Sequence, residues 1–263
     1  MFALKAPSPG HRAVLAAVAL LCLIAGPLLA GSLASRPAAA EPAAGTLVVV
    51  ELFTSQGCSS CPPADALLTE LAGRSDVVAL SLHVDYWDYI GWKDPYASPQ
   101  HTARQQRYAQ SLNLRYVYTP QIVVDGRANV VGSHRAEVLA AIETAARRDR
   151  PIDITFGTDN GGTVIIPAGH APDEGATVWL AVYDREHVTE IKRGENAGQE
   201  LRNANVVRSF ERLGTWTGAR LEIPLDLSGA RARGRDGCAV IVQQGRTGPV
   251  LAAAAMSLDD LGR

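Results

Sequence analysis

The chain has little of three things: positive charge, cysteine, and apolar runs beyond its start. It carries 25 basic and 27 acidic residues in 263 positions, and residues 1–40 hold three of the basic ones and none of the acidic ones. The remainder, with 22 basic and 27 acidic residues and a net charge near −5, lacks the basic face that nucleic-acid binding needs. No stretch after residue 40 is apolar over enough length to cross a bilayer. Four cysteines are too few and too unevenly spaced for a disulfide-stapled scaffold: Cys22, Cys58, Cys61 and Cys238.

Residues 1–40 have the three-part layout of a secretory signal peptide. A basic start at Lys5 precedes an apolar run from Ala13 to Ala30, and small residues at 38–40 suit cleavage near Ala40–Glu41. We therefore expect an exported protein, periplasmic or secreted. An uncleaved membrane anchor is the alternative, because the apolar run approaches the length that spans a bilayer, and we expect membrane association only in that case.

Hydrophobic periodicity predicts an α/β, thioredoxin-like domain over residues 45–150, followed by a second domain over residues 151–263. The first has the order β-α-β-α-β-β-α, which calls for a sheet with helices packed on it. In the second, six short strands lie between turn-rich pieces and no helical period stands out, which predicts an antiparallel, sandwich-like β domain. The elements predicted for the first domain are strands 47–53, 77–84, 121–124 and 128–131, a helix from Cys61 or Pro62 to Gly73, and helices 102–112 and 135–148.

The most informative motif is Cys58-Ser59-Ser60-Cys61, where a strand gives way to a helix. Thiolates are favoured at that place by the partial positive charge of the helix N-terminus. Pro62 suits the first helical turn, so we expect Cys58 to lie exposed just outside the helix and Cys61 to be partly buried on its apolar stripe. This predicts that Cys58 is the catalytic nucleophile and Cys61 the resolving thiol. Half a zinc or copper site and an inert structural disulfide are the alternatives.

A second signal is Thr119-Pro120, directly before the strand 121–124. Proline cannot join a central ladder and so should open the strand, and an X-Pro bond can be cis at modest cost. With the β-α-β order and the upstream cysteine pair, this closely resembles the thioredoxin fold, which pairs an active-site disulfide with a cis-proline loop. The resemblance implies that the Thr119 backbone binds a substrate strand beside Cys58. An ordinary trans proline is the alternative.

Two further residues are candidates for proton transfer. Glu51 is the only charge in the first strand, and the resemblance implies that it is the counterpart of a buried acid in thioredoxins; a solvated glutamate at a sheet edge is equally consistent. His83 ends the second strand and is able to move protons at neutral pH. If the two strands are parallel, both end at the same edge, where ligand sites of α/β sheets lie. Trp87 and Trp92 would then wall the cleft around Cys58 and bind extended peptide or another apolar substrate, or else simply pack against the sheet.

These motifs together resemble the bacterial family called domain of unknown function 1223. The resemblance rests on Glu51–Asp65, His83–Trp92, Thr119–Pro120 and Arg193–Gly198, and it covers essentially the whole chain after the leader. It implies a secreted or periplasmic protein with a thioredoxin-like fold, while leaving the substrate open. Ser59-Ser60 between the cysteines departs from the Gly-Pro of typical thioredoxins.

The sequence thus predicts an exported thiol–disulfide oxidoreductase that acts on a protein or small thiol substrate. It requires no metal and no cofactor, because the cysteine pair itself carries the electrons. One rival is a periplasmic copper carrier using Cys58, Cys61 and His83, since soft thiolates favour copper(I). Another is a non-catalytic binding module whose disulfide is locked. Cys238 is expected to be a buried small hydrophobe, with a redox role as the alternative.

Overall fold

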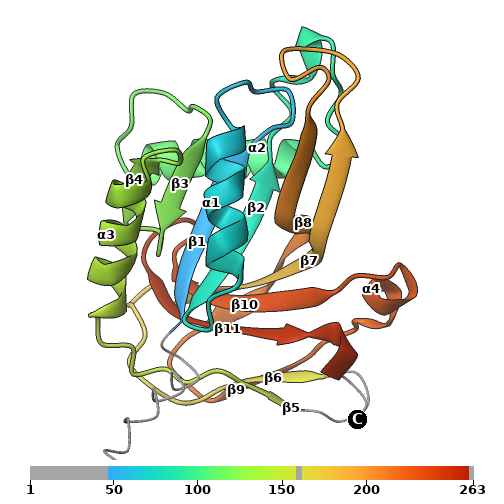
Figure 1. The fold of residues 1–263 in the computed structure, drawn as a ribbon. Coiled ribbons are helices and arrows are strands. Elements are labelled where there is room, and N and C mark those ends of the chain that lie inside the picture. Colours follow the sequence, from blue (N-terminus) through green and yellow to red (C-terminus); the bar gives the residue numbers. More distant parts are fainter. Residues whose placement is uncertain (1–46, 158–161, 261–263) are drawn as a thin grey trace, which may run out of the picture. The chain divides into compact units, whose positions relative to one another are not determined.

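An eight-stranded sheet in the order β11-β10-β7-β8-β2-β1-β3-β4 runs through the protein (Figure 1). The computed structural model describes residues 47–157 and 162–260, so the predicted signal peptide lies outside the described residues. None of the helices in these two ranges is both long and apolar enough for a membrane span.

The first half of the chain has the predicted order of elements. These are β1 (Val48–Thr54), α1 (Pro62–Ala72), β2 (Val77–His83), the 3-10 turn η1 (Asp88–Ile90), α2 (Pro99–Ser111), β3 (Gln121–Val124), β4 (Ala128–Val131) and α3 (Arg135–Ala146). β1 runs parallel to β2, with Thr54 opposite His83, and antiparallel to β3. The two strands are thus parallel, and their carboxyl ends meet at one edge of the sheet.

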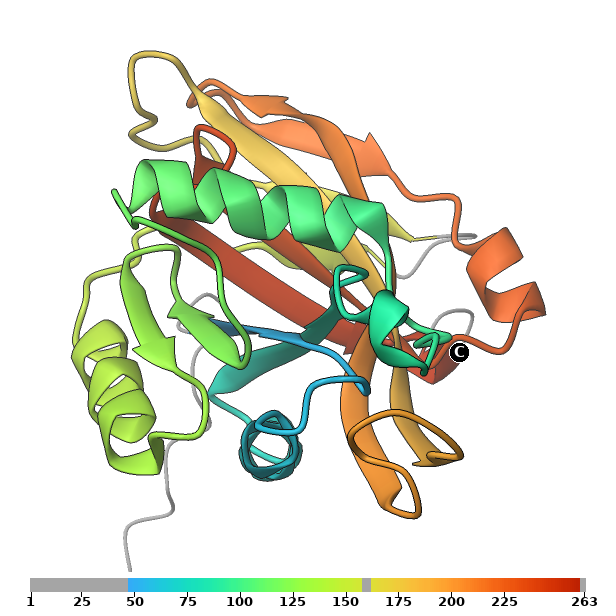
Figure 2. The same cartoon turned by 90° about the horizontal axis from the view of Figure 1, so that it is seen from above.

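The central strand β1 is buried on both faces, which explains its nearly continuous apolar sequence. Val50 and Leu52 pack with α1 and α3, whereas Val49 and Phe53 pack on the other face with Tyr108 of α2. Helices α1 and α3 thus cover one face of this part of the sheet and α2 covers the other (Figure 2). Alternation along β1 decides which side chains reach α1.

The second half differs from the expectation of a self-contained β sandwich. β7 (Ala176–Glu190), β8 (Glu200–Trp216), β10 (Gly237–Gln244) and β11 (Val250–Ser257) continue the same sheet as β1 and β2. The physical reason is the length of β8: it has 17 residues where short strands were predicted, and its edge meets β2 in parallel where Ser81 lies opposite Val206. The domain boundary between residues 150 and 151 stays a prediction.

A second, three-stranded sheet completes the fold. It contains β5 (Thr155–Gly157), β6 (Thr163–Ile166) and β9 (Leu221–Pro224), and two short helical pieces follow, α4 (Ser228–Ala232) and η2 (Leu258–Asp260). Its apolar side chains pack on β7, β10 and β11, so sheet-on-sheet packing does occur in this half. The tip of the β7–β8 hairpin rises to the same end of the molecule as the loop after β1 (Figure 1). That end carries the candidate site.

Candidate redox site at the end of β1

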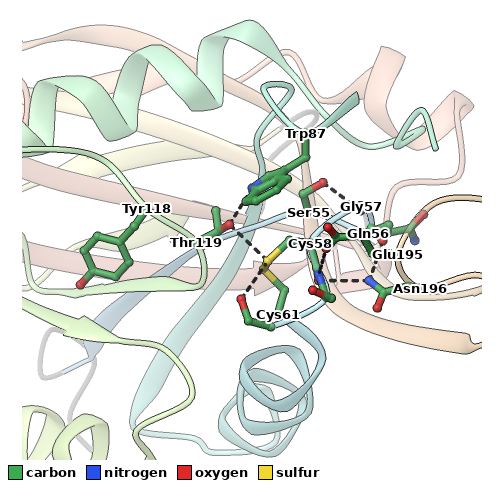
Figure 3. The surroundings of a disulfide bond; sticks show 12 residues. Ser55, Gln56, Gly57, Cys58, Cys61, Trp87, Tyr118, Thr119, Glu195 and Asn196 are labelled. Atoms are coloured by element: carbon green, nitrogen blue, oxygen red, sulfur yellow. Dashed lines mark hydrogen bonds between the residues drawn. A yellow bond between two sulfur atoms is a disulfide. The ribbon is translucent and has the colours of Figure 1, made fainter. Parts of the chain in front are cut away.

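Cys58 and Cys61 are joined by a disulfide, with 5.4 Å between their Cα atoms (Figure 3). Cys61 is the N-cap of α1, and two prolines follow it in the first turn. The Cys61 N–H donates to the Cys58 carbonyl at 3.2 Å, which closes the loop between strand and helix. The expectation of an exposed Cys58 is wrong, because only 1% of Cys58 and none of Cys61 is accessible to solvent.

Thr119 and Trp87 account for part of this burial. The Thr119 hydroxyl donates to Cys58 Sγ at 3.2 Å, and the Trp87 indole N–H donates to the same hydroxyl at 2.7 Å (Figure 3). The Thr119-Pro120 bond is cis, as predicted, and the Pro120 carbonyl accepts from Gly132 N at 2.9 Å. Gly57 lets the Trp87 backbone approach, since a Cβ there would lie 3.3 Å from Trp87 Cβ. The structure thus gathers Thr119, Pro120 and Trp87 at the disulfide, and their role in substrate binding stays a prediction.

The β7–β8 tip holds the cysteine loop from the other side. The Asn196 side chain, itself buried, donates to the carbonyls of Gln56 at 2.9 Å and Cys58 at 3.0 Å. Glu195 lies at the rim, with Oε2 3.4 Å from Ser59 N. In the sequence, the Gly and Asn residues of 193–198 are typical of a polar turn. Nothing in the sequence pairs Asn196 with a loop 138 residues away.

Trp92 lies apart from the disulfide. Its indole N–H donates to Gln56 Oε1 at 3.1 Å, and its Cβ faces Gly194, where an added Cβ would lie only 3.2 Å away. Trp92 therefore joins the cysteine loop to the β7–β8 tip. Its predicted contact with substrate stays a prediction.

Glu51 is fully buried in an ion pair with Arg104 of α2. Arg104 Nε donates to Oε1 at 2.6 Å and Nη2 donates to Oε2 at 3.0 Å, while the Tyr108 hydroxyl makes a short hydrogen bond to Oε2. The alternative of a solvated glutamate is therefore wrong. In β1, Glu51 shares the α2 face with Val49 and Phe53, and in the described part of the chain no hydrogen bond joins it to either cysteine.

His83 is fully buried on the α1 side of β2. Its Nδ1 lies 2.7 Å from Asp94 Oδ2, which also accepts from Gln56 N at 2.8 Å, while Oδ1 accepts from Tyr96 N at 2.9 Å. Burial opposes the charged imidazole, but the carboxylates of Asp94 and Asp65 outweigh it, so the pKa of His83 is raised. Burial also opposes the charge of Asp94, yet His83 outweighs it and the pKa of Asp94 is lowered.

Asp65 is the acidic residue that sequence reasoning missed. It lies in α1 one turn after Cys61, and only 4% of it is exposed. Burial raises the pKa of Asp65 to about 7, and His83 offsets part of that rise. Thr54 and Asn203 also favour its charged form, although neither makes a hydrogen bond of normal geometry with Oδ1.

A signal for Asp65 was present in the sequence. It interrupts the buried stripe of α1 formed by Cys61, Ala64 and Leu68. Acidic residues are common in the first turn of a helix because they interact favourably with the helix dipole. The sequence position of Asp65 therefore does not by itself indicate that its side chain is buried.

The sequence and the structure of this chain are similar to those of known proteins. Residues 49–243 match the sequence model of a family described as Protein of unknown function (DUF1223). The chain belongs to this family. A crystal structure of an Agrobacterium tumefaciens protein is similar at 32% identity and a TM-score of 0.71, covering 81% of this chain and 94% of that one. HBP35 of Porphyromonas gingivalis shares the fold at 13% identity and a TM-score of 0.53, over 81% of this chain and 75% of its own. A search of the curated proteins finds no match.

The structure also bears on Cys238 and on the alternative of a metal site. Cys238 is buried in β10 between Val182 of β7 and Met256 of β11, and burial raises its pKa to about 12. It behaves as a small apolar side chain, as predicted. Over residues 47–157 and 162–260, no three His, Cys, Asp or Glu side chains converge in a way that suits a metal ion.

Proposed function

We propose that this member of the family is an exported thiol–disulfide oxidoreductase with a thioredoxin-like fold. The observation that carries the proposal is the hydrogen bond from Thr119, the residue of the cis-proline loop, to Cys58 of a disulfide at the N-terminus of α1. Parallel β1 and β2, joined through α1, and the β3–β4 hairpin with α3 support the same fold.

In the direction that reduces a substrate disulfide and oxidises the cysteine pair, the reaction has two steps. The Cys58 thiolate attacks one sulfur of a substrate disulfide; a mixed disulfide forms and one substrate thiolate leaves. The Cys61 thiolate then attacks Cys58 Sγ, the mixed bond breaks, and the second substrate thiolate leaves. Two electrons pass from protein to substrate, and the two thiol protons end on the departing thiols. The same steps run in reverse with a dithiol substrate.

The surroundings of Cys58 fit a thiolate in these steps. The N-terminus of α1 supplies partial positive charge, and the Thr119 hydroxyl donates to the sulfur. Because Cys58 is almost completely covered, a protein or small disulfide reaches it only after the cover of Trp87 or the β7–β8 tip shifts.

Equilibration against glutathione redox buffers tests the proposal. The wild type should show a single two-electron transition of Cys58–Cys61, Cys58→Ala should lose it, and Cys238→Ala should keep it unchanged. Trapping free thiols with an alkylating reagent and weighing the products by mass spectrometry counts the thiols at each potential. A disulfide that stays closed under strongly reducing buffer would favour the locked binding module instead.

A further inference from the structure

Five buried polar side chains meet between α1 and the strands β1, β2 and β8, each with an atom that makes no hydrogen bond within the described residues. We call these residues the buried polar cluster: Thr54, Asp65, Ser81, His83 and Asn203. Thr54 and His83 are paired neighbours at the ends of β1 and β2, and Ser81 lies on the same face of β2. Buried polar groups are normally paired, so a concentration of unpaired ones calls for a functional explanation.

The cluster lies next to the cysteine pair. Asp65 follows Cys61 by four residues, and its N–H donates to the Cys61 carbonyl at 3.1 Å. Helical side chains at this spacing lie on one face, so Asp65 and Cys61 share the buried side of α1 that faces the sheet. Asp65 Oδ1 is one of the unpaired atoms.

Asp65 also borders a cavity. It lines a cavity of about 340 Å³ between α1 and the start of β8, together with Pro62, Thr69, Leu201 and Arg202. Asp65 thus borders this cavity, although only 4% of the residue is exposed. Glu51 has no such position, because Arg104 and Tyr108 occupy both of its oxygens.

His83 supplies the second proton-binding group. Asp94 holds Nδ1, which leaves Nε2 unpaired inside the cluster. The charged groups that act on His83 are Asp94, Asp65 and, with opposite sign, Arg208 of β8. From α2, His101 Nδ1 lies 3.0 Å from the His83 carbonyl, and the Tyr96 ring meets the imidazole edge-on with 5.4 Å between centroids.

We propose that Asp65 accepts the proton of Cys61 in the resolving step, and that His83, oriented by Asp94, shares this proton. This inference rests on the proposed redox function. In this step the Cys61 S–H bond breaks and its proton goes to Asp65, directly or through one water. The Cys61 sulfur then bonds to Cys58 Sγ, the mixed disulfide breaks, and the departing thiolate takes a proton from solvent. In the reverse direction Asp65 returns the proton to Cys61 on reduction. Asp65 acts on the reacting thiol, His83 shares the proton that Asp65 accepts, and Asp94 is a positioning residue.

Rapid mixing of reduced protein with oxidised glutathione separates the two steps. Cys61→Ala protein reports only the attack by Cys58, and release of the second glutathione from protein with both cysteines reports the resolving step. Asp65→Asn should slow the resolving step at pH 7 by about 10- to 100-fold, the scale of general base catalysis, and leave the first step within about twofold. Glu70→Gln, an exposed acid on the same helix, is the matched control and should change neither.

The outcomes distinguish this inference from the function on which it rests. If Cys61→Ala protein forms no mixed disulfide, the redox function fails and the relay with it. If the first step proceeds and Asp65→Asn resolves at the wild-type rate, or if Glu70→Gln slows resolution equally, only the relay fails.

A measurement on the wild type tests the relay even if Asp65→Asn does not fold. Infrared difference spectra between reduced and oxidised protein near pH 7 should contain a band of a protonated buried carboxyl. The absence of that band overturns the relay.

Discussion

The Thr119 hydroxyl lies 3.2 Å from Cys58 Sγ although 61 positions separate the two residues in the chain. This contact joins the cis-proline loop to the cysteine pair. We therefore predict that loss of the Thr119 hydroxyl changes the pKa of the Cys58 thiol. Thr119→Val removes the donor and keeps the shape of the side chain. A hydrogen bond to a charged group contributes about 1.5–3 kcal/mol, so the pKa of the Cys58 thiol should rise by about one to two units.

The pH dependence of Cys58 alkylation in the reduced protein measures this shift. Thr144→Val is a suitable control, because the Thr144 hydroxyl bonds only to a carbonyl of its own helix on the surface of α3. An unchanged alkylation profile in Thr119→Val would remove the donor role of Thr119.

Trp87 and Trp92 form a matched pair for the second prediction. Both are partly buried and donate an indole N–H, but Trp87 donates to Thr119 and Trp92 to Gln56. Trp87→Phe should loosen the Thr119 hydroxyl and lower the reduction potential of the cysteine pair by about 10–20 mV, since 30 mV corresponds to about 1.4 kcal/mol for two electrons. Trp92→Phe should leave the potential unchanged. Equal shifts in the two variants would show that the effect is general to the loop.

Asn196 should stabilise the cysteine loop. Asn196→Ala removes two hydrogen bonds and leaves the carbonyls of Gln56 and Cys58 without their buried donor. At about 1 kcal/mol per hydrogen bond, the free energy of unfolding in urea should fall by about 2 kcal/mol. Amide exchange over residues 55–60 should accelerate more than exchange in α3. Gln106→Ala on the exposed side of α2 serves as control, and a loss of equal size there would contradict the prediction.

Glu51 and Arg104 should matter for stability and not for proton transfer. Glu51→Gln leaves the buried Arg104 charge without its carboxylate, which should cost about 3–5 kcal/mol of unfolding free energy. The pH dependence of the resolving step in the folded fraction should match the wild type. If Glu51→Gln instead slows the resolving step at pH 7 as Asp65→Asn is expected to, Glu51 is the proton acceptor.

The raised pKa of Asp65 should make the free energy of unfolding depend on pH. Its pKa is about 7 in the folded protein against an ordinary value of 3.8, so between these values the native state binds more protons than the unfolded chain. Stability from this group therefore falls as pH rises from about 4 to 7, by on the order of 3–4 kcal/mol. Asp65→Asn should be more stable than the wild type at pH 8 and gain little at pH 4. Urea unfolding at the two pH values checks this, and a variant that is less stable at pH 8 would contradict it.

The sequence by itself determined the elements of the first half and the place of the cysteine pair between β1 and α1. Periodicity, paired prolines and the Asp125-Gly126 turn are local signals, so strands, helices, hairpin and the place of Cys58-Cys61 followed from them. The cis Thr119-Pro120 bond was predicted correctly because proline alone makes that geometry affordable.

Tertiary structure decided the rest. Whether Cys58 is covered depends on Trp87, Thr119 and Asn196, which come from three separate segments. Whether Glu51 or Asp65 lies beside the cysteines depends on which face of a strand or helix each occupies once β8 has joined β2. Local patterns record that a side chain is buried, but burial against a particular partner is set by contacts between residues far apart in the chain.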